Sequence, residues 1–261
     1  MTVQGKFKYK GDGTAGPITS PAYNPGPVMF TDSDVLAIRY TSDAATVAPL
    51  IPDMFTIDDQ PECLVGWYNW GMSKNGPYRE VMFFVTVNFG GASYAYCPFL
   101  YVTNDASLIA GREPLGYPKL IADIDFTPKR EARDSLIKGV VERPAGVPLA
   151  YAIARPVEYM GSIQETKNLF PVRSSIGLRN HPGVPPVVDV VRNQTRVLEG
   201  DVWKCDGTMA YTGFSAIDSL HQLPVVKPLD AILVTNAKIQ LIKGTAVRLQ
   251  SKQSKPQLEK A

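Results

Sequence analysis

Short apolar segments separated by turn-forming residues set the pattern of this sequence. Residues 120–126 alternate, with apolar Ile124 and Phe126 each following an acidic residue, Asp123 or Asp125. A period of two residues predicts a strand with one buried face. The 22 prolines and 21 glycines are spread along the whole chain. Breakers distributed in this way favour many short strands and turns over long helices.

The other strands are predicted from similar apolar runs. They cover residues 35–40, 63–70, 78–89, 94–103, 136–143, 148–155, 187–191, 196–205 and 230–242. The turn signal Lys74-Asn75-Gly76-Pro77 joins two of these runs, and a turn of this kind between two apolar runs predicts a hairpin.

Short helices are predicted where a capping side chain comes before a helix-compatible run. Asp43 is a candidate cap for a helix that ends near Pro52, and Asn104-Asp105 for a helix over residues 106–110. Residues 215–221 form a third candidate helix. Residues 156–186 contain Pro171, Pro182, Pro185 and Pro186, and we expect a long irregular connection there.

The chain shows no internal repeat and no break in composition that would mark a second domain. We therefore expect one domain over residues 1–261, with residues 1–15 and 245–261 as frayed arms and a polar tail from residue 244. The predicted fold is mainly β, a single antiparallel barrel or sandwich-like domain with a few short helices.

Charge and cysteine content exclude several classes of function. The formal net charge of +2 gives no electrostatic case for binding nucleic acid or a membrane surface. The three cysteines are odd in number and have no metal-ligand spacing, which argues against a disulfide framework, a zinc site or any other metal centre. His181 and His221 lie in proline-flanked loops, without the Gly-x-Ser-x-Gly motif of a serine hydrolase.

The compartment is also constrained by sequence. The polar start of the chain lacks the apolar core of a signal peptide, and no apolar run approaches the length of a membrane span. We expect a cytoplasmic protein that has no membrane partner.

One lysine lies in an unusually apolar part of the sequence. Lys119 follows Pro118 directly, between the predicted helix and the strand of residues 120–126. Its sequence neighbours are Leu115, Tyr117, Leu120 and Ile121. Burial among such groups disfavours the charged amine and lowers its pKa. A neutral amine can attack a carbonyl carbon and form a Schiff base, which makes Lys119 the candidate catalytic residue.

The residues around Lys119 resemble a known family. Ala110-Gly111-Arg112-Glu113, followed by Tyr117-Pro118-Lys119, is similar to the core motif of acetoacetate decarboxylases. Thr19-Ser20-Pro21-Ala22 with Gly26-Pro27, and Leu223-Pro224-Val225-Val226, resemble segments near the two ends of that family. The resemblance implies a double-layered antiparallel β-barrel or cone with short flanking helices, no metal or organic cofactor, and a homo-oligomer.

The resemblance also assigns roles. It implies a Schiff-base lysine at Lys119 and a nearby carboxylate from the hairpin, which we place at Glu80 as a proton shuttle or a group that orients the lysine. The alternative for Glu80 is a hairpin residue paired with Arg79. Arg112 and Glu113 are candidates for a substrate clamp, although an ion pair that holds the motif is the stronger interpretation.

The chain departs from the family pattern at three positions. Leu120 stands where the decarboxylases usually carry a second lysine, so burial would have to lower the pKa of Lys119 instead. Ser33 stands where the resemblance places the arginine that binds the substrate carboxylate. Gly66 or an aromatic neighbour stands at the position of a second acidic residue. Because of these departures, the resemblance supports Schiff-base chemistry at Lys119 better than it supports acetoacetate as the substrate.

Aromatic residues of the hairpin complete the candidate site. Trp67, Tyr68, Trp70 and Tyr78 are mostly expected in the core, and Tyr78 and Trp67 are the candidates for lining the substrate pocket. If they do, we expect a substrate that is larger and more apolar than acetoacetate.

The predicted function is a Schiff-base lyase that decarboxylates a 3-oxo acid through an iminium on Lys119. The first alternative is an aldolase-dehydratase that condenses a pyruvate-type donor with an aldehyde through the same lysine. The second alternative is a β-barrel that binds a small ligand and has no catalytic activity. In the first two interpretations, the partner is a small-molecule keto acid.

Overall fold

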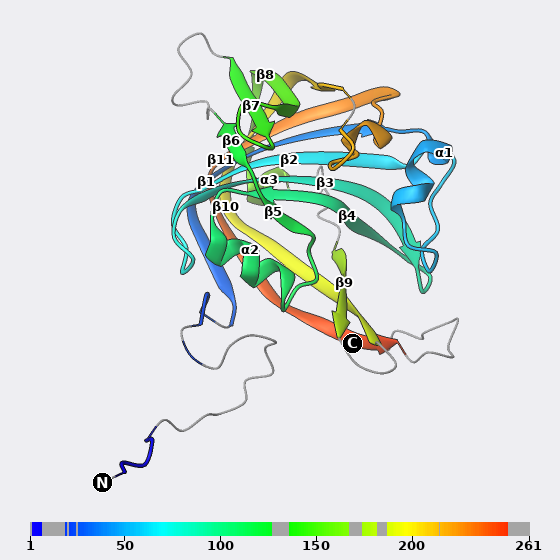
Figure 1. Cartoon of the computed structure of the whole chain (residues 1–261). Helices are drawn as coiled ribbons and strands as arrows, with labels where there is room; N and C mark the ends of the chain where they lie inside the picture. The colour runs from blue at the N-terminus through cyan, green and yellow to red at the C-terminus, as the bar shows by residue number, and fades with distance from the viewer. Residues whose placement is uncertain are drawn as a thin grey trace.

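The computed structural model describes residues 2–6, 19, 21–24, 26–126, 136–166, 174–181, 187–213 and 215–249. Strands form most of the described chain (Figure 1). They are β1 (Val28–Thr41), β2 (Glu62–Trp70), β3 (Tyr78–Phe89), β4 (Ala92–Val102), β5 (Lys119–Ile121), β6 (Asp123–Phe126), β7 (Ile137–Glu142), β8 (Pro148–Ser162), β9 (Ser175–His181), β10 (Val187–Tyr211) and β11 (Lys227–Leu249).

The helices are short. They are α1 (Ala44–Val47) with the 3₁₀ turn η1 (Ala48–Leu50), α2 (Asp105–Arg112), α3 (Ile163–Thr166) and the 3₁₀ turn η3 (Leu220–Gln222). The predicted caps of the first two helices are present, because Asp43 accepts from the Thr46 backbone N–H and Asn104 from that of Ser107. The prediction of a mainly β fold with a few short helices is confirmed.

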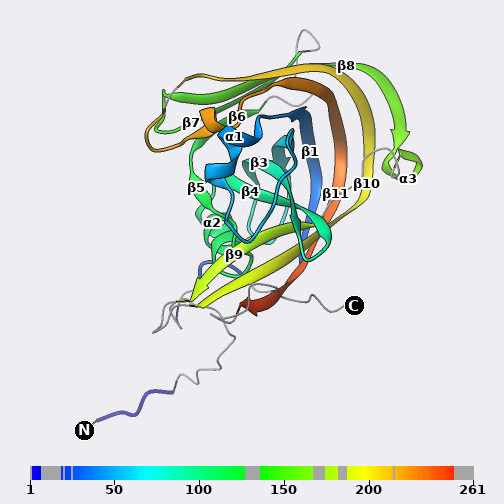
Figure 2. The ribbon, with the colours of Figure 1, turned by 90° about the vertical axis from the view of Figure 1, so that its right-hand side faces the viewer.

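The sheet closes on itself through its two longest strands. Its order is β11-β1-β2-β3-β4-β9-β10-β8-β7-β6, and β10 pairs with β11 as well, so the first seven strands of this order form a closed ring. The N-terminal part of β10 pairs with β9 and its C-terminal part pairs with β8. Figure 2 shows β10 and β11 curving together around one side of the molecule.

Strands β6, β7 and β8 continue from this ring and fold back over it as a second layer (Figure 1). The larger core cluster, which we call the interlayer core, lies between them and β1–β4, and includes Trp67, Phe83, Phe126 and Ile137. A smaller cluster on the other side of β1–β4 includes Phe30, Trp70, Tyr78 and Tyr117. We call it the site-side cluster, because Lys119 and α2 lie on this side.

Two predictions about the second half of the chain are wrong. Residues 156–186 are not one irregular connection, since β8 continues to Ser162 and is followed by α3 and β9. Past Arg155, β8 pairs only with β10, so Pro156 interrupts no ladder on its other edge. Residues 187–191 and 196–205 belong to one strand, β10.

The end of the chain also differs from expectation. Residues 215–221 contain no α-helix, and only the 3₁₀ turn η3 begins there. The tail predicted to fray from residue 244 is wrong for residues 244–249. They belong to β11, and residues 245–249 pair with β10, with Leu249 opposite Val188. Residues 250–261 lie outside the described residues, as do most of residues 1–15. The single domain over 1–261 stays a prediction.

Candidate active site

The lysine singled out in the sequence is held inside the fold by the shortest strand. Strand β5 pairs parallel to β4, with Lys119 opposite Leu100, and only 6% of Lys119 is exposed. Arg112 Nη1 donates to the Lys119 carbonyl at 3.0 Å, and the Tyr117 N–H donates to the Gly111 carbonyl at 3.0 Å. The end of α2 and the start of β5 therefore fix the backbone on both sides of the loop between them.

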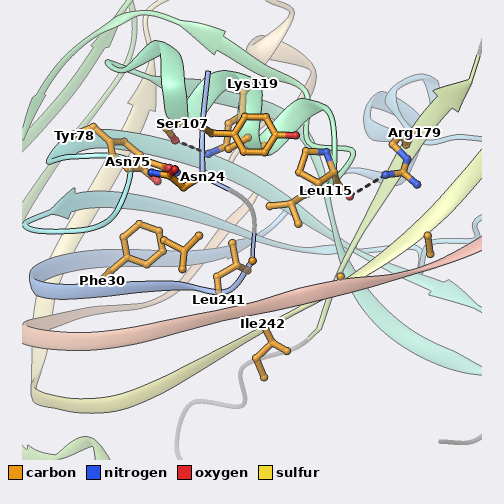
Figure 3. Close-up of a pocket in the computed structure, with 18 residues that line it drawn as sticks. Asn24, Phe30, Asn75, Tyr78, Ser107, Leu115, Lys119, Arg179, Leu241 and Ile242 are labelled. Carbon is orange, nitrogen blue, oxygen red and sulfur yellow. Dashed lines mark hydrogen bonds between the residues drawn. The ribbon is translucent and has the colours of Figure 1, made fainter. Parts of the chain in front are cut away.

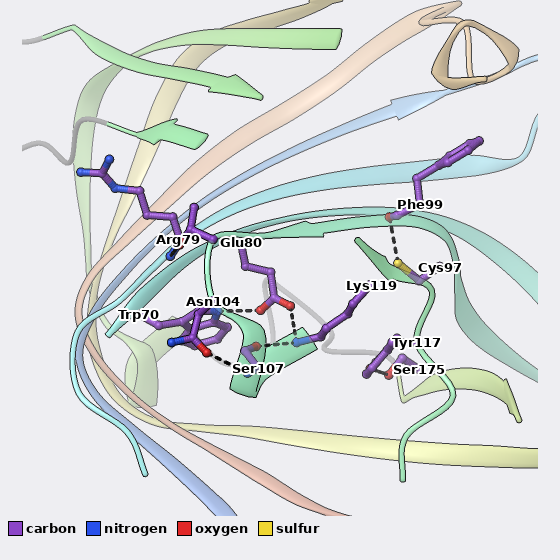
Figure 4. A network of polar contacts seen from close by, with 11 residues as sticks. Trp70, Arg79, Glu80, Cys97, Phe99, Asn104, Ser107, Tyr117, Lys119 and Ser175 are labelled. Atoms are coloured by element: carbon purple, nitrogen blue, oxygen red, sulfur yellow. Dashed lines mark hydrogen bonds and ion pairs between the residues drawn. The ribbon is translucent and has the colours of Figure 1, made fainter. Parts of the chain in front are cut away.

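The Lys119 ammonium points at a carboxylate (Figure 4). Its Nζ lies 2.7 Å from Glu80 Oε1, donates to Ser107 Oγ at 2.9 Å, and is 5.7 Å from the centre of the Tyr78 ring. Because both members of the Lys119–Glu80 pair are buried, their attraction is screened much less than that of a surface pair. Removing either partner would leave an uncompensated buried charge.

Glu80 is fixed by a second contact. It lies on β3 with 1% exposed, and its Oε2 accepts from the Trp70 indole N–H at 2.6 Å. Strands β2 and β3 are paired so that Tyr68 lies opposite Glu80 and Trp70 lies opposite Tyr78. Each carboxylate oxygen thus has one cationic or N–H partner, which holds the group in a single orientation.

Helix α2 packs unusually close to the lysine. A Cβ at Gly111 would lie 2.3 Å from Lys119 Cε and 2.4 Å from its Cδ. Only glycine at position 111 leaves room for the aliphatic part of the Lys119 side chain. One helical turn earlier, Ser107 presents its hydroxyl to Nζ, because residues three and four apart share a face of a helix.

Lys119 opens onto a cavity of about 460 Å³. Its described lining comes from the segment before β1, from β1, β3, β5, β9 and β11, from the turn between β2 and β3, and from α2 and the loop that follows it. The lining includes Tyr23, Asn24, Phe30, Asn75, Tyr78, Ser107, Leu115, Lys119, Arg179, Leu241 and Ile242. Figure 3 shows these side chains around the cavity. A cavity of this size is in the range of small-ligand sites.

Phenols near the lysine are kept neutral. Burial raises the pKa of Tyr78 well above its ordinary value, and the negative charge of Glu80 adds to that shift. Burial likewise raises the pKa of Tyr117, whose hydroxyl hydrogen-bonds to the Ser175 hydroxyl. Both groups can therefore donate a proton or a hydrogen bond at neutral pH, and neither acts there as a phenolate.

The structure brings three of the predicted site residues together: Lys119, Glu80 and Tyr78. Arg112 and Glu113 lie beside this group but hold the surrounding chain. Arg112 bonds the Lys119 backbone, and Glu113 Oε2 accepts from the Tyr23 hydroxyl at 3.1 Å. Both side chains therefore hold the surrounding chain by hydrogen bonds rather than by the expected ion pair, and a role in substrate binding stays a prediction.

Two other predicted residues do not reach the cavity. Trp67 is fully buried in the interlayer core, on the face of β2 opposite to Trp70. Ser33 is also fully buried, and its hydroxyl accepts from the Gly71 N–H at 3.3 Å. A shift in register between Phe30 and Ser33 separates Ser33 from the part of β1 that lines the cavity.

Three residues at the site were not predicted. Ser107 could have been found from the helix pattern, as it lies three positions after the cap Asn104. Trp70 could have been chosen over Trp67 from the hairpin register, because alternate residues of a strand share a face. Arg179 lies in the segment taken as irregular, so nothing in the sequence pattern placed it near Lys119.

The described part of the chain holds neither a cluster of metal ligands nor a helix that could cross a membrane. No group of three or more His, Cys, Asp or Glu residues there is placed to hold a metal ion. Helices in the same ranges are all too short or too polar to cross a membrane. Cys63, Cys97 and Cys205 are buried thiols that form no disulfide.

Comparison with known proteins identifies relatives over most of the chain. The family model described as acetoacetate decarboxylase matches residues 15–247. Decarboxylase DEC1 of Cochliobolus heterostrophus is 30% identical over 240 residues, which are 88% of this chain and 93% of that protein.

Solved structures share the fold. Acetoacetate decarboxylase from Legionella pneumophila superposes with a TM-score of 0.74 at 17% identity, covering 90% of this chain and 93% of that one. The enduracididine biosynthesis enzyme MppR, complexed with the condensation product of pyruvate and imidazole 4-carboxaldehyde, gives a TM-score of 0.71 at 16% identity. That match covers 90% of this chain and 98% of the other.

Proposed function

The chain belongs to the acetoacetate decarboxylase family and is a lyase, and from this premise we propose that it acts through a Schiff base between Lys119 and an oxo acid. The observation that carries the proposal is the buried contact of 2.7 Å between Lys119 Nζ and Glu80 Oε1, at the wall of a largely apolar cavity. A buried amine beside a carboxylate has the parts that imine formation needs.

The first step is proton transfer out of the ammonium. The amine attacks only when its nitrogen lone pair is free, and Glu80 Oε1 is within hydrogen-bond reach to accept the proton. The neutral amine then adds to the oxo carbon of the substrate and gives a carbinolamine. Glu80 returns the proton to the hydroxyl of that intermediate, water departs, and an iminium is left on Nζ.

The iminium then accepts the electron pair of the bond that breaks. For a 3-oxo acid, the bond to the carboxylate carbon breaks, CO2 leaves, and the electron pair forms an enamine with the nitrogen neutral. Protonation of the enamine carbon restores the iminium, and water hydrolyses it to release a ketone and the free amine. Tyr78 lies beside the nitrogen, and its neutral hydroxyl is the acid for this proton, which water then returns to the phenol oxygen.

Decarboxylation of a 3-oxo acid is the reaction we favour. It is supported by the family and by the name decarboxylase of the relative that is 30% identical. The apolar lining also favours loss of a charged carboxylate as neutral CO2, because a carboxylate is poorly stabilised away from water.

Aldol condensation with dehydration is the second candidate. It is favoured by Leu120, which stands where the resemblance places the second lysine of the decarboxylases. MppR shares the fold and binds a pyruvate condensation product. In that reaction, the same iminium would lose an α-proton to give the enamine that attacks an aldehyde. A keto-acid substrate, a cytoplasmic location and a homo-oligomer complete the proposal.

The two reactions are separated by their products. We expect CO2 from a series of 3-oxo acids with the wild-type chain, and no consumption of pyruvate in the presence of aromatic or aliphatic aldehydes. Pyruvate consumption without CO2 release would replace the first reaction by the second. The Lys119→Arg chain serves as the matched control in both assays, since it keeps the positive charge beside Glu80.

A further inference from the structure

The loop between α2 and β5 carries Lys119 but has no regular secondary structure of its own. Residues 113–118 follow the last residue of α2 and come directly before Lys119. The 2.7 Å contact between the amine and Glu80 Oε1 therefore depends on where this loop lies. A buried loop needs partners for its backbone polar groups from outside its own segment, and here they come from β9 and β10.

One side of β9 faces this loop. Alternate residues of a strand share a face, and those concerned here are Ser175, Gly177 and Arg179. We call these three residues the loop-facing side of β9. At its first position, the Ser175 hydroxyl hydrogen-bonds to the Tyr117 hydroxyl, and Figure 4 shows this pair beside Lys119. The end of the loop is thus tied to the start of β9.

At the middle position, the backbone of the loop lies directly on the backbone of β9. A Cβ at Gly177 would lie 2.4 Å from the Leu115 carbonyl oxygen, and a Cβ at Gly116 would lie 2.9 Å from the Leu178 carbonyl carbon. Gly116 also has a φ of +70°, a conformation that favours glycine. Two glycines, one on each segment, therefore allow this close approach.

The start of the loop is held by donors from two side chains. Arg179 Nη1 donates to the Glu113 carbonyl at 3.3 Å and lies 3.5 Å from the Pro114 carbonyl. Asn193 of β10 is fully buried, and its Nδ2 donates to the Leu115 carbonyl at 3.0 Å. Three consecutive carbonyls after the end of α2 thus meet donors from β9 and β10.

The charge of the arginine is balanced within the protein. Arg179 Nη2 donates to Asp189 Oδ2 at 2.8 Å, and Asp189 is 3% exposed. The arginine can therefore hold the loop without adding net charge to the site. A buried ion pair is often no more stabilising than apolar residues of the same volume, which favours a role of this pair in fixing the loop.

We propose that the loop-facing side of β9, together with Asn193, positions the Lys119 amine against Glu80. Its members are positioning residues, because they act on the amine through the backbone of residues 113–117. The proposal rests on the Schiff-base function proposed above. It adds that the rate of the covalent step is set in part by two strands that are distant from Lys119 in the sequence.

The first test changes the middle of the loop-facing side by one methyl group. Gly177→Ala places a Cβ against the Leu115 carbonyl and should move the loop. We expect kcat for CO2 release from 3-oxohexanoate to fall by about 10²-fold, as for a misplacement of about 1 Å, while KM stays within about twofold. A crystal structure of the variant should show a longer distance between Lys119 Nζ and Glu80 Oε1 than the 2.7 Å of the wild type.

Gly207→Ala is the matched control. A Cβ at Gly207 would lie 2.7 Å from Ala231 Cβ, so this variant also crowds a neighbour, but on the part of β10 that pairs with β8. It should lower the unfolding temperature and keep the wild-type kcat. An equal fall of kcat in both folded variants would overturn the proposal, because crowding anywhere in the sheet would then explain it.

A second variant removes the donors without adding volume. Arg179→Met with Asp189→Leu replaces the ion pair by apolar residues, an exchange that buried pairs often tolerate. Its unfolding temperature should stay near that of the wild type. We expect kcat to fall about tenfold, because the loop carbonyls lose the arginine. Arg179→Lys keeps the pair with Asp189 and a donor for the loop, and should bring kcat back to within about threefold of the wild type.

The outcomes separate this proposal from the Schiff-base function. A wild-type kcat in either folded variant, or an unchanged contact between Lys119 and Glu80 in Gly177→Ala, overturns the positioning role. If the wild-type chain releases no CO2 and borohydride traps neither 3-oxohexanoate nor pyruvate on Lys119, the Schiff-base function fails. The crystal structure of Gly177→Ala then still decides whether β9 positions the amine.

Discussion

Both faces of the β2–β3 hairpin carry a buried tryptophan, but one face only packs and the other also holds the polar contacts of the site. On one face, Trp67 and Val81 are fully buried in the interlayer core. On the other, Trp70 and Glu80 join the site-side cluster and the lysine. The two tryptophans differ most clearly at the indole nitrogen. That of Trp70 donates to Glu80 at 2.6 Å, whereas that of Trp67 has no hydrogen-bond partner among the described residues.

The difference shows how one pair of strands serves both packing and chemistry. Successive residues of a strand point to opposite sides, so every second position can be apolar while its neighbours carry polar groups. The second layer of β6–β8 covers one face, and α2 with β5 covers the other. Burial alone therefore does not identify the site. The hydrogen-bond partners of the buried polar side chains help to identify it, because most buried polar groups in proteins are paired.

The largest change is expected on the polar face, from Glu80→Gln. Loss of the carboxylate removes the proton acceptor beside Lys119, and we expect activity to fall by about 10²–10⁴-fold. The unpaired ammonium should also lower the free energy of unfolding, by about 3–5 kcal/mol if it stays charged. Steady-state assays and denaturant titration measure the two effects.

Glu62→Gln is the matched control for that variant. Glu62 pairs with Arg39 at 3.5 Å on the partly exposed edge of β2, where such pairs contribute at most about 1 kcal/mol. The control should keep nearly full activity. Equal activity loss in both variants would contradict a special role for Glu80.

The substitution Gly111→Ala on α2 should lower activity by displacing the side chain of Lys119. Gly111→Ala would raise helix propensity by about 1 kcal/mol, yet its Cβ overlaps Lys119 Cε and Cδ. We expect the displaced amine to lose about 10²-fold in activity, as for a misplacement of about 1 Å. Gly5→Ala, where a Cβ meets nothing within 4 Å, should change neither rate nor stability. Full activity in Gly111→Ala would show that the close packing does not position the amine.

The two tryptophans provide the direct comparison of the faces. Trp70→Phe removes the hydrogen bond to Glu80, and we expect about a tenfold loss of activity with little change in substrate affinity. Trp67→Phe leaves space in the interlayer core, so it should lower the free energy of unfolding by about 1–3 kcal/mol and keep the activity of the folded chain. Activity assays and urea unfolding of both variants test these two expectations. Loss of activity in Trp67→Phe and loss of stability alone in Trp70→Phe would contradict the roles assigned to the two faces.

Thiol reactivity gives the smallest expected effect. Burial raises the pKa of Cys63 on the interlayer core to about 12, and burial also raises the pKa of Cys97 on the site-side cluster. Both thiols should therefore stay protonated at pH 8 and react slowly with a thiol reagent until the chain unfolds. The pKa of the Cys63 thiol is higher in the folded chain than in the unfolded chain. The protonated thiol therefore contributes stability to the fold below about pH 9, and this contribution is lost as the pH rises toward 12.

Rates of labelling, read by mass spectrometry in the native and the urea-unfolded chain, measure this. Slow labelling of both cysteines indicates that water is excluded from both faces. Labelling of Cys97 at the rate of the unfolded chain would show that the site-side cluster is open to solvent.

Local patterns predicted the hairpin and the lysine, because these depend on short segments. Residues 74–77 carry the turn, and the capped helix with Pro118 places Lys119 at the start of a strand. The choice of Trp67 over Trp70 failed for a physical reason. Both are apolar aromatics in one strand, and only the register with β3 shows which of them shares a face with Glu80.

Contacts between distant segments could not be predicted in the same way. Arg179 reaches the cavity because β9 pairs with both β4 and the N-terminal part of β10. The bulge that buries Ser33 away from the cavity arises where β1 meets β11 and the turn after β2. Such pairings depend on the whole sheet, and no window of a single sequence contains them.

The central claim is that Lys119 forms an imine, and covalent trapping tests it most directly. The wild-type chain is incubated with 3-oxo acids and with pyruvate, reduced with borohydride, and digested for mass spectrometry. The account predicts a stable adduct on Lys119 in the wild-type chain and none in Lys119→Arg. An adduct on another lysine, or no adduct with any of these acids while the chain is folded, would contradict the account and favour a barrel that only binds ligands.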